Sequence, residues 1–337
     1  MKVLVTGASG YIGSHACLEL LNAGHEVVGF DNFSNSSPES IERVKALSGK
    51  DMRLVKLDLL DPEGLDALVD EGFDAVMHFA GLKAVGESVE KPQLYHENNV
   101  IGTHHLLSAM ERTDCRRLVF SSSCTVYGAV EKNPVDERHP RGAVNPYGKT
   151  KLDIEDMCYE LATEDKRWKI ALLRYFNPVG AHESGRIGDD PRGVPNNLMP
   201  YVMQVAVGRR PFVNVWGGDY PTHDGTGVRD YIHVVDLALG HVAALEKLDD
   251  FKGAQAVNLG AGRGYSVLEV VAAAAKAAGK TIPHKMMPRR PGDAPAIWAE
   301  PALAKKKLGW QTTRDLEAMC ADAWNWQKQN PEGFGAA

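Results

Sequence analysis

The sequence predicts an α/β protein built on a doubly wound parallel sheet, with a smaller and discontinuous second domain. Three observations predict this fold class. Short apolar runs alternate with helix-forming stretches through the first half of the chain, and strands that alternate with helices assemble into parallel sheets. Glycines at positions 7, 10 and 13 follow the first apolar run. Polar residues follow several later runs, at the sheet edge where such proteins bind ligands.

The first strand and the turn after it carry the clearest signal. Residues 2–6 are apolar with β-branched side chains, which indicates a buried strand, and a helix is expected over 14–24. Between them Gly7, Gly10 and Gly13 allow a tight turn, and the helix N-terminus offers free amide groups to a diphosphate. Strand, glycine turn and helix in this order are typical of a Rossmann-type dinucleotide-binding domain.

The rest of the first half supplies alternating elements. Further strands are expected at residues 26–30, 53–57, 75–79, 117–120 and 168–174, and helices at 62–69, 91–110 and 147–161. Short connections between alternating strands and helices favour a parallel order.

The second half is more mixed in character. We expect helices at residues 198–208, 234–248, 267–278, 301–308 and 315–329, and strands at 212–216, 228–233 and 256–259. Long glycine-rich loops are expected at 182–197 and 217–227, and such loops are commonly functional. We therefore expect a dinucleotide-binding domain over 1–176, with 230–260 returning to it, and a substrate domain over 177–337.

Polar residues at the predicted strand ends indicate which dinucleotide is bound. Asp31 ends the second strand, where an acidic side chain accepts hydrogen bonds from a ribose and repels a 2′-phosphate. This favours NAD over NADP, although a strand-end turn would also explain an aspartate. Asp58, residues 80–83 and Ser123 follow three other strands. Because the carboxyl ends of parallel strands share one edge, we expect these residues to lie together.

Composition limits the partners and the compartment. A net charge of −6 argues against general affinity for nucleic acid. The five cysteines form no C-x-x-C motif, which indicates reduced thiols in the cytoplasm, and no metal site is predicted. The N-terminus enters the first strand directly, so no signal peptide is expected. The longest apolar stretch, 267–279, is too short to cross a membrane.

Ser123, Tyr147 and Lys151 are the candidate catalytic residues. Tyr147 and Lys151 are four residues apart and share one helix face. Lowering a tyrosine pKa from about 10 to about 7 takes roughly 4 kcal/mol, which is about what a cation at ~4 Å supplies in a dielectric of ~20. If the site excludes water, Lys151 with the help of the positive nicotinamide ring could supply this shift, and Tyr147 would then remove an alcohol proton that Ser123 helps to hold. An exposed helix start with a solvated lysine would also explain the spacing.

Seven longer motifs carry a family resemblance. They are HFAGLKAVGES at 78–88, SSS at 121–123, TVYG at 125–128, YGK at 147–149, LRYFNPVGA at 173–181, NNLMP at 196–200 and DGTGVRDYIH at 224–233. Together with the glycine turn they resemble the extended short-chain dehydrogenase/reductase family, and within it the enzymes that epimerise UDP-hexoses at C4. The resemblance extends from Met1 to beyond Trp326.

This resemblance implies an activity. Tyr147 would take the 4-hydroxyl proton while tightly bound NAD accepts the C4 hydride. The 4-keto sugar would turn within the site and receive the hydride on its other face. UDP-galactose and UDP-glucose would thus interconvert, as in galactose metabolism, on a UDP-sugar-binding domain over 177–337. The family also implies a homodimer through the helices at 91–110 and 147–161.

The resemblance also implies two sets of contacts. The NAD-binding residues are Gly7, Gly10, Tyr11, Ile12, Gly13, Asp31, Asn32, Asn35, Ser36, Asp58, Leu59, Phe79, Ala80, Gly81, Lys83, Asn98, Ser123, Tyr147, Lys151 and Phe176. The substrate-binding residues are Lys83, Ser123, Tyr147, Asn177, Asn197, Leu198, Met199, Asn214, Val215, Trp216, Arg229, Arg290 and Asp293. Two of the latter are arginines, which form forked hydrogen bonds to phosphate.

Two alternatives stay open on the sequence. One is a related nucleotide-sugar enzyme, such as a 4,6-dehydratase or a decarboxylase; dehydratases of the family carry an Asp-Glu pair where this chain has Cys124-Thr125. The other is a dinucleotide-sensing module without catalysis, since fold alone does not imply activity. Ile297 occupies a position whose size the family ties to N-acetylhexosamine turnover, and it leaves that substrate open.

Overall fold

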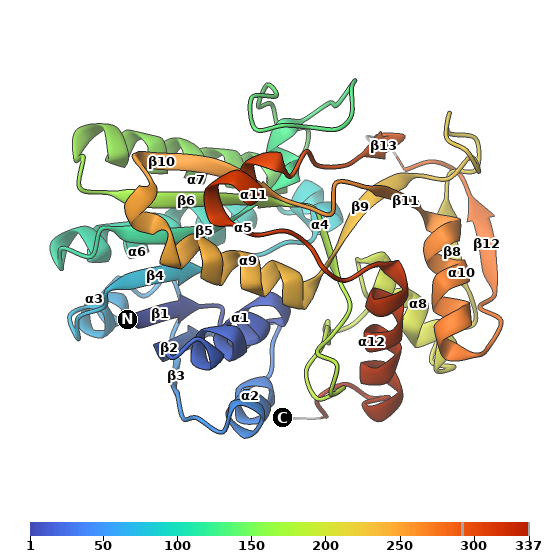
Figure 1. The fold of residues 1–337 in the computed structure, drawn as a ribbon, viewed down its shortest axis with the longest axis horizontal. Helices are drawn as coiled ribbons and strands as arrows, with labels where there is room; N and C mark the ends of the chain where they lie inside the picture. The colour runs from blue at the N-terminus through green and yellow to red at the C-terminus, as the bar shows by residue number, and fades with distance from the viewer. Residues whose placement is uncertain (291–292, 336–337) are drawn as a thin grey trace.

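The computed structural model describes residues 1–290 and 293–335, and a seven-stranded parallel sheet dominates it (Figure 1). The strands are β1 (Lys2–Thr6), β2 (Glu26–Asp31), β3 (Arg53–Lys56), β4 (Ala75–His78), β5 (Arg117–Ser123), β6 (Lys169–Tyr175) and β10 (Gly253–Leu259). Their order is β10-β6-β5-β4-β1-β2-β3, and each neighbouring pair is parallel. The strand order reverses between β1 and β4, which is where such sheets bind ligands.

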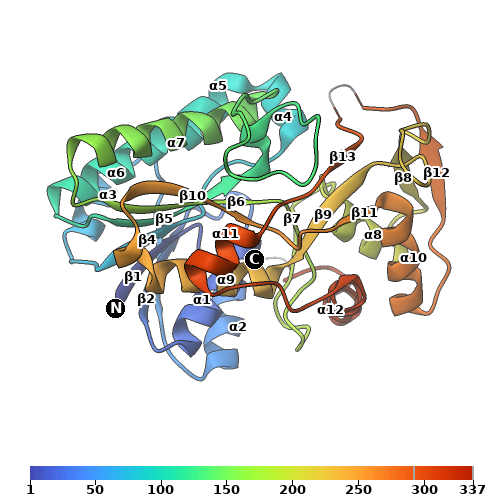
Figure 2. The same ribbon diagram turned by 45° about the horizontal axis from the view of Figure 1, so that its top comes forward.

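Helices cover both faces of this sheet, as Figure 2 shows. One face carries α1 (Tyr11–Asn22), α2 (Glu39–Ser48) and α9 (Val234–Glu246), and the other carries α3 (Pro62–Val69), α6 (Gly102–Arg112) and α7 (Pro146–Glu164). The alternation along β1 explains the two layers. Val3 and Val5 are buried in the first core and Leu4 in the second, because successive side chains of a strand point to opposite faces. The predicted α/β, doubly wound fold class is confirmed.

A smaller unit is built from segments that lie before and after β10 in the chain (Figure 1). Its four-stranded sheet contains β7 (Asn177–Val179), β9 (Val228–His233), β11 (Gly264–Ser266) and β13 (Ala296–Ile297), and β8 (Val213–Trp216) pairs with β12 (His284–Met287). The helices α8 (Leu198–Ala206), α10 (Val267–Ala278) and α12 (Leu316–Gln329) share a core with these strands. A further helix, α11 (Ala302–Leu308), packs beside β10 in the first core.

The long helix expected at 91–110 is present from Pro92 to Arg112, but it contains a π-helical segment that we did not predict. It consists of α5 (Pro92–Tyr95), the π-helical segment (His96–Ile101) and α6, and the short helix α4 (Val85–Glu90) precedes it. Within the wider π turn, Asn99 Oδ1 accepts from Leu82 N at 2.7 Å, and Asn99 Nδ2 donates to Leu82 O at 2.9 Å. These tertiary bonds to a neighbouring loop accompany the π-helical widening of the helix, and π turns are frequently found at functional sites.

Several short elements were not predicted. Helix α2 and the strands β7, β11, β12 and β13 lie in stretches that we expected to be loops or left unassigned. The last four contain two to four residues, too few for a period to emerge.

Neither a membrane span nor a metal site is found among the described residues 1–290 and 293–335. No helix there combines the length and apolarity needed to cross a bilayer. No group of three or more His, Cys, Asp or Glu side chains in these ranges is arranged to hold a metal ion. All five cysteines are free thiols.

Candidate active site

The turn at 7–13 accepts only glycine at two of its positions. Gly7 has φ +65°, a left-handed conformation that side chains rarely adopt. A Cβ on Gly13 would lie 2.2 Å from the carbonyl oxygen of Gly7. Gly10 is the N-cap of α1, and no side chain caps that helix. The first amide groups of α1 therefore remain available to an anion.

Asp31 lies beside this turn. Its Oδ2 accepts from Ser9 N at 3.0 Å, and its Oδ1 accepts from Phe33 N at 2.9 Å and Ser36 Oγ at 2.8 Å. The carboxylate is buried and fixed in direction, with lone pairs left over, since each carboxylate oxygen accepts more than one hydrogen bond.

The loop after β2 connects to two other parts of the chain. Asn32 Nδ2 donates to Asp58 Oδ2 at 2.8 Å, which joins the ends of β2 and β3. Arg192, from the loop before α8, donates its backbone N to Asn35 Oδ1 at 3.2 Å and its Nη2 to Ser36 O at 3.0 Å. Leu59 is buried against Gly102, so its side chain cannot reach a ligand and only its backbone can.

The segment 79–83 follows β4 at the same edge. Ala80 N donates to Thr6 Oγ1 at 3.0 Å, and Phe79 packs on His241 with ring centroids 4.8 Å apart. Gly81 and Lys83 are exposed at the end of this segment. Asn98, in the π-helical segment, is half-buried beside Asn99, which holds Leu82. The strand-end residues thus surround the glycine turn.

The three candidate catalytic residues come together at the end of β5. Asn145 caps α7 by accepting from Gly148 N at 2.8 Å, which starts the helix so that Tyr147 lies in its first turn. Lys151, one turn later, donates its Nζ to Ser121 O at 2.7 Å. Ser123 Oγ accepts from Thr125 Oγ1 at 3.0 Å.

Burial shifts the pKa values of Tyr147 and Lys151. It raises the pKa of the Tyr147 phenol well above its usual value; the neighbouring Tyr175 adds to this, and the Ser123 hydroxyl opposes it. Burial also lowers the pKa of Lys151 to about 8, and Glu155 opposes this change. The lowering of the Tyr147 pKa that we expect from Lys151 and the positive nicotinamide ring together therefore has to overcome this burial.

The predicted substrate residues lie mainly on the smaller unit. Asn177 Nδ2 donates to Asp230 O at 2.9 Å, which orients the asparagine at the start of β7. Arg229 on β9 lies 3.7 Å from the Asp293 carboxylate. The Arg290 guanidinium lies 4.8 Å from the centroid of the Trp216 ring. These contacts gather arginines and one aromatic ring near β8 and β9.

The remaining substrate candidates differ in what they expose. Asn197 is the exposed N-cap of α8, and its side chain makes no capping bond. Leu198 and Asn214 are half-buried. Met199 and Val215 are buried in the core of the smaller unit, so Val215 offers a ligand only its backbone.

Comparison with known proteins adds the family. A family profile described as GDP-mannose 4,6 dehydratase matches residues 4–323. The UDP-glucose 4-epimerase of Bacillus subtilis (strain 168) is 58% identical over 338 residues, which is 100% of both chains. The Homo sapiens enzyme of the same name is 56% identical over 99% of this chain and 98% of its own. A solved UDP-glucose 4-epimerase from Bifidobacterium longum, in complex with NAD+ and UDP, has a TM-score of 0.96 and 50% identity over 99% of this chain and 100% of its own.

The chain belongs to the UDP-glucose 4-epimerase family. The resemblance to extended short-chain dehydrogenase/reductases is confirmed, and so is its epimerase branch. The dehydratase profile describes the wider family, whereas the full-length relatives above are epimerases.

The first half of this epimerase-family chain fits a dinucleotide. The Cβ that Gly13 lacks would fill the turn beside the uncapped start of α1. The Ser9 hydroxyl is buried at this turn without a hydrogen-bond partner among residues 1–290 and 293–335. An unpaired buried hydroxyl is costly unless a polar group meets it. Donors and the fixed Asp31 carboxylate therefore lie where a diphosphate and a ribose would need them.

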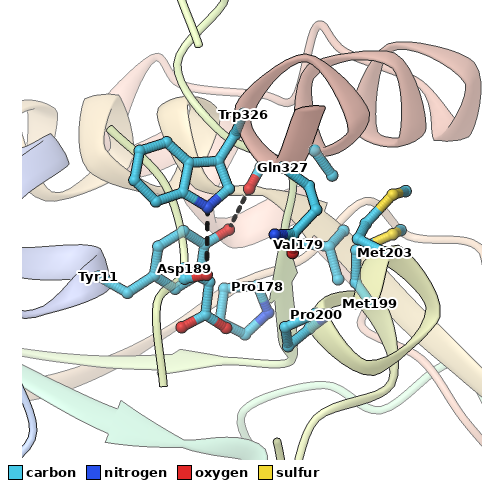
Figure 3. Close-up of a pocket in the computed structure, with 11 residues that line it drawn as sticks. Tyr11, Pro178, Val179, Asp189, Met199, Pro200, Met203, Trp326 and Gln327 are labelled. Atoms are coloured by element: carbon cyan, nitrogen blue, oxygen red, sulfur yellow. Dashed lines mark hydrogen bonds between the residues drawn. The ribbon is translucent and has the colours of Figure 1, made fainter. Parts of the chain in front are cut away.

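A small cavity lies between Tyr11 of the glycine turn and residues of the smaller unit (Figure 3). Tyr11 donates its hydroxyl to Gly180 O at 2.7 Å, and Trp326 Nε1 donates to Asp189 O at 3.3 Å across it. The hydrogen bond to Gly180 uses the one proton that the Tyr11 hydroxyl can donate. Met199 lines the other side of the cavity.

Three residues near the trio were missed. The hydroxyls of Tyr175 and Ser121 are hydrogen-bonded to each other. Tyr95 OH donates to Glu87 Oε2 at 3.0 Å, close enough to Tyr147 to influence its pKa. Glu155 is fully buried one turn beyond Lys151. The local pattern predicts apolar core positions for Tyr175 and Tyr95 and an exposed helix position for Glu155. No local pattern therefore indicates that these residues lie near the trio.

Proposed function

We propose that this chain interconverts UDP-galactose and UDP-glucose by epimerisation at C4, with tightly bound NAD as its cofactor. The observation that supports this proposal most directly is that Ser123, Tyr147 and Lys151 come together at the end of β5, on the sheet edge that also carries the glycine turn after β1. It stands in a chain that is 58% identical along its whole length to a UDP-glucose 4-epimerase. The chain is an NAD-dependent enzyme.

The cofactor is held by the first half of the chain. The amides at the start of α1 bind its diphosphate, and Asp31 accepts hydrogen bonds from the adenosine ribose. Asn32, Asn35, Ser36 and Asp58 border that ribose, and the segment 79–83 with Asn98 and Phe176 borders the other half. NAD, when bound, accepts the hydride from C4 and returns it to the opposite face.

Tyr147 moves the proton. Its phenolate accepts the proton of the 4-hydroxyl group, whose oxygen Ser123 holds by a hydrogen bond. Because burial raises the pKa of Tyr147, the phenolate needs neighbouring positive charge. Lys151 supplies one positive charge and the oxidised cofactor ring another, and both favour the charged form of the phenol.

The second half of the chain holds the nucleotide end of the substrate. Arg229 and Arg290 bind the diphosphate of UDP, and Trp216 packs near the uracil. Because the UDP end stays bound there, the 4-keto sugar can rotate and present its other face without leaving the site. The other substrate contacts are Lys83, Asn177, Asn197, Leu198, Met199, Asn214, Asp293 and the backbone of Val215.

Product analysis tests the proposal. Purified protein incubated with UDP-galactose, and in parallel with UDP-N-acetylgalactosamine, is analysed for nucleotide sugars and for retained NAD. We expect UDP-glucose without net consumption of cofactor, and a loss of about 10²–10⁴-fold in rate for Tyr147→Phe with NAD content unchanged. A keto-deoxy product would show a dehydratase instead, and binding without turnover would show a sensing module.

We propose further that the chain forms a homodimer through the layer that contains α4, α5 and the π-helical segment. Val85, Val89, Leu94 and Ile101 expose 42, 63, 42 and 39% of their surfaces there, and large apolar residues so grouped indicate an interface. A second copy covers them because the family resemblance implies an interface on the helices at 91–110 and 147–161, and α4 directly precedes the first of these.

The oligomeric state tests this interface. Val89→Asp should shift the sedimentation coefficient from dimer to monomer, because a carboxylate would be buried without a partner. Met286→Asp is the matched control, since Met286 is 49% exposed on β12. A dimer that survives Val89→Asp unchanged would contradict the interface.

We also propose a cytoplasmic location. The five thiols are free, and four of them are buried, as expected for a protein of a reducing compartment. Fractionation of cells that express a tagged chain checks this; a secreted product would contradict it.

A further inference from the structure

A buried ion pair lies behind the catalytic trio. Glu155 on α7 and Arg174 on β6 are 0 and 1% exposed. Arg174 Nε donates to Glu155 Oε1 at 2.8 Å, and its Nη2 donates to Oε2 at 2.6 Å. Neither residue is among those expected to touch cofactor or substrate. Because two desolvated charges seldom stabilise a fold more than apolar residues would, the pair calls for another explanation.

The pair reaches the catalytic strand through hydrogen bonds. Ser122 donates its hydroxyl to Glu155 Oε1 at 2.6 Å. Lys151, one turn earlier on the same helix face, donates its Nζ to Ser121 O at 2.7 Å. Lys151 and Glu155 therefore hold two consecutive residues of β5, and the next residue is Ser123.

Glu155 is also the carboxylate that acts on Lys151. Burial disfavours the Lys151 ammonium, and the charge of Glu155 favours it. From β4, His78 faces Lys151, and burial lowers the pKa of that imidazole to about 3, so it stays neutral. From β5, the Phe120 ring lies 4.8 Å from Nζ.

Other titratable groups near Lys151 lie on α7, on β6 and in the loop before α7. On α7 Tyr147 lies one turn before it. On β6 the Tyr175 hydroxyl is bonded to Ser121, and the Arg174 charge is paired with Glu155. Arg141 approaches the outer side of Glu155, at 3.5 Å from Oε2, and also pairs with Asp156 at 2.8 Å. Among these groups Glu155 is the one that favours a charged Lys151.

We propose that Glu155, fixed by Arg174 and Ser122, is a positioning residue of the epimerase reaction that keeps Lys151 in its ammonium form and holds Ser123 in register. This inference rests on the proposed function, because it concerns the same trio. Glu155 touches neither the cofactor nor the sugar. It acts through Lys151, by charge along one helix turn, and through Ser123, by the hydrogen bond to its neighbour Ser122.

The test separates charge from packing with three variants. Glu155→Gln keeps an acceptor for Ser122 but removes the charge and leaves Arg174 unpaired. Glu155→Gln combined with Arg174→Met removes both charges, so the fold is relieved of an unpaired buried guanidinium. Glu155→Asp keeps the charge on a shorter side chain.

Two readouts are taken on the holoenzyme of each variant. The first is the pH profile of kcat, and the second is the NMR titration of the Lys151 Nζ signal in ¹⁵N-lysine-labelled protein, assigned with Lys151→Met. We expect the alkaline limb and the titration midpoint to fall by about one unit or more in Glu155→Gln, as for loss of an opposite charge at close range. The double variant should show a fall too, and Glu155→Asp should stay near the wild type.

Unshifted profiles and titration in both Glu155→Gln and the double variant, with kcat reduced only in proportion to the folded fraction, would overturn the inference. Failure of the proposed function is a separate result, because it would appear as wild-type protein that does not convert UDP-galactose. The NMR titration needs no turnover and still reports on Lys151 in that case.

Discussion

Substituting Gly13 by alanine tests the part of the molecule on which cofactor binding depends. The added Cβ would lie 2.2 Å from Gly7 O, 3.0 Å from Gly7 C and 3.1 Å from Ala8 Cα. All three atoms belong to backbone, so no side chain can rotate away. The same Gly7 oxygen already accepts from Gly10 N at 3.1 Å. The turn therefore has to open, and the start of α1 has to move with it.

The magnitude follows from that geometry. Overpacking costs about 1–3 kcal/mol and occasionally more, and a contact with immobile backbone belongs at the upper end. If about 3 kcal/mol falls on the diphosphate geometry, NAD affinity drops about 150-fold at ~1.4 kcal/mol per tenfold. If it falls on the fold, the melting temperature drops by roughly 6 °C at about 2 °C per kcal/mol. Both effects are within reach of simple measurements.

The assay is the NAD content of purified protein after acid precipitation, together with thermal unfolding with and without added NAD. The matched control is Gly142→Ala in the loop before α7, where an added Cβ meets nothing within 4 Å. We expect the control to keep its NAD and its melting temperature. Wild-type NAD content and an unchanged melting temperature in Gly13→Ala would refute the reasoning that this turn is the cradle of the diphosphate.

Three further predictions concern separate parts of the chain. Asp31→Asn removes a charge and an acceptor for Ser9 N. NAD should therefore bind about 10- to 150-fold more weakly, which corresponds to ~1.5–3 kcal/mol for a charged hydrogen bond, and the preference for NAD over NADP should shrink. Titrations with both dinucleotides measure the two affinities. Arg229→Lys replaces a planar fork by a point charge, so KM for UDP-galactose should rise about tenfold or more, at ~1.5 kcal/mol for a hydrogen bond to a charged group, with kcat little changed; an unaltered KM would contradict the diphosphate contact. Burial lowers the pKa of His241 from 6.5 to about 4. Between pH 6.5 and pH 4 the imidazole is therefore protonated in the unfolded chain but not in the folded one. The free energy of unfolding should fall as the pH falls through this range, by about 1.4 kcal/mol per pH unit. Denaturant unfolding of His241→Leu at pH 7 and pH 5 should show the variant gaining relative to wild type at pH 5; a pH-independent difference would show that His241 does not titrate as its burial requires.

The prediction of the candidate active site depended on local patterns, and it could be made where the geometry is local. The glycine turn, the strand-end carboxylate Asp31 and the helical pair Tyr147 and Lys151 each lie within one strand–turn–helix unit or one helix turn. In these units the allowed φ values and the side-chain period decide the geometry. Their gathering at one edge followed from the parallel order of the strands.

Prediction failed where distant segments decide the geometry. The helix over 91–110 has an ordinary apolar stripe, yet Asn99 sits in a π turn bonded to Leu82. The balance between burial and positive charge at Tyr147 is not contained in the sequence either, because a sequence does not report how much water surrounds a phenol. Glu155 and Arg174 are 19 residues apart on different elements, and nothing in their spacing indicates that they pair.

The sequence by itself determined the parallel α/β fold, the glycine turn between its first strand and helix, and the shared helix face of Tyr147 and Lys151, because backbone freedom and short-range periodicity are properties of consecutive residues. Only the tertiary structure decided which charges are buried, that Lys151 rests on the Ser121 carbonyl, that Tyr11 bridges to Gly180 and that Glu155 stands behind the trio. Those features arise from packing between elements far apart in the chain, where solvent exclusion sets the energy of every charge.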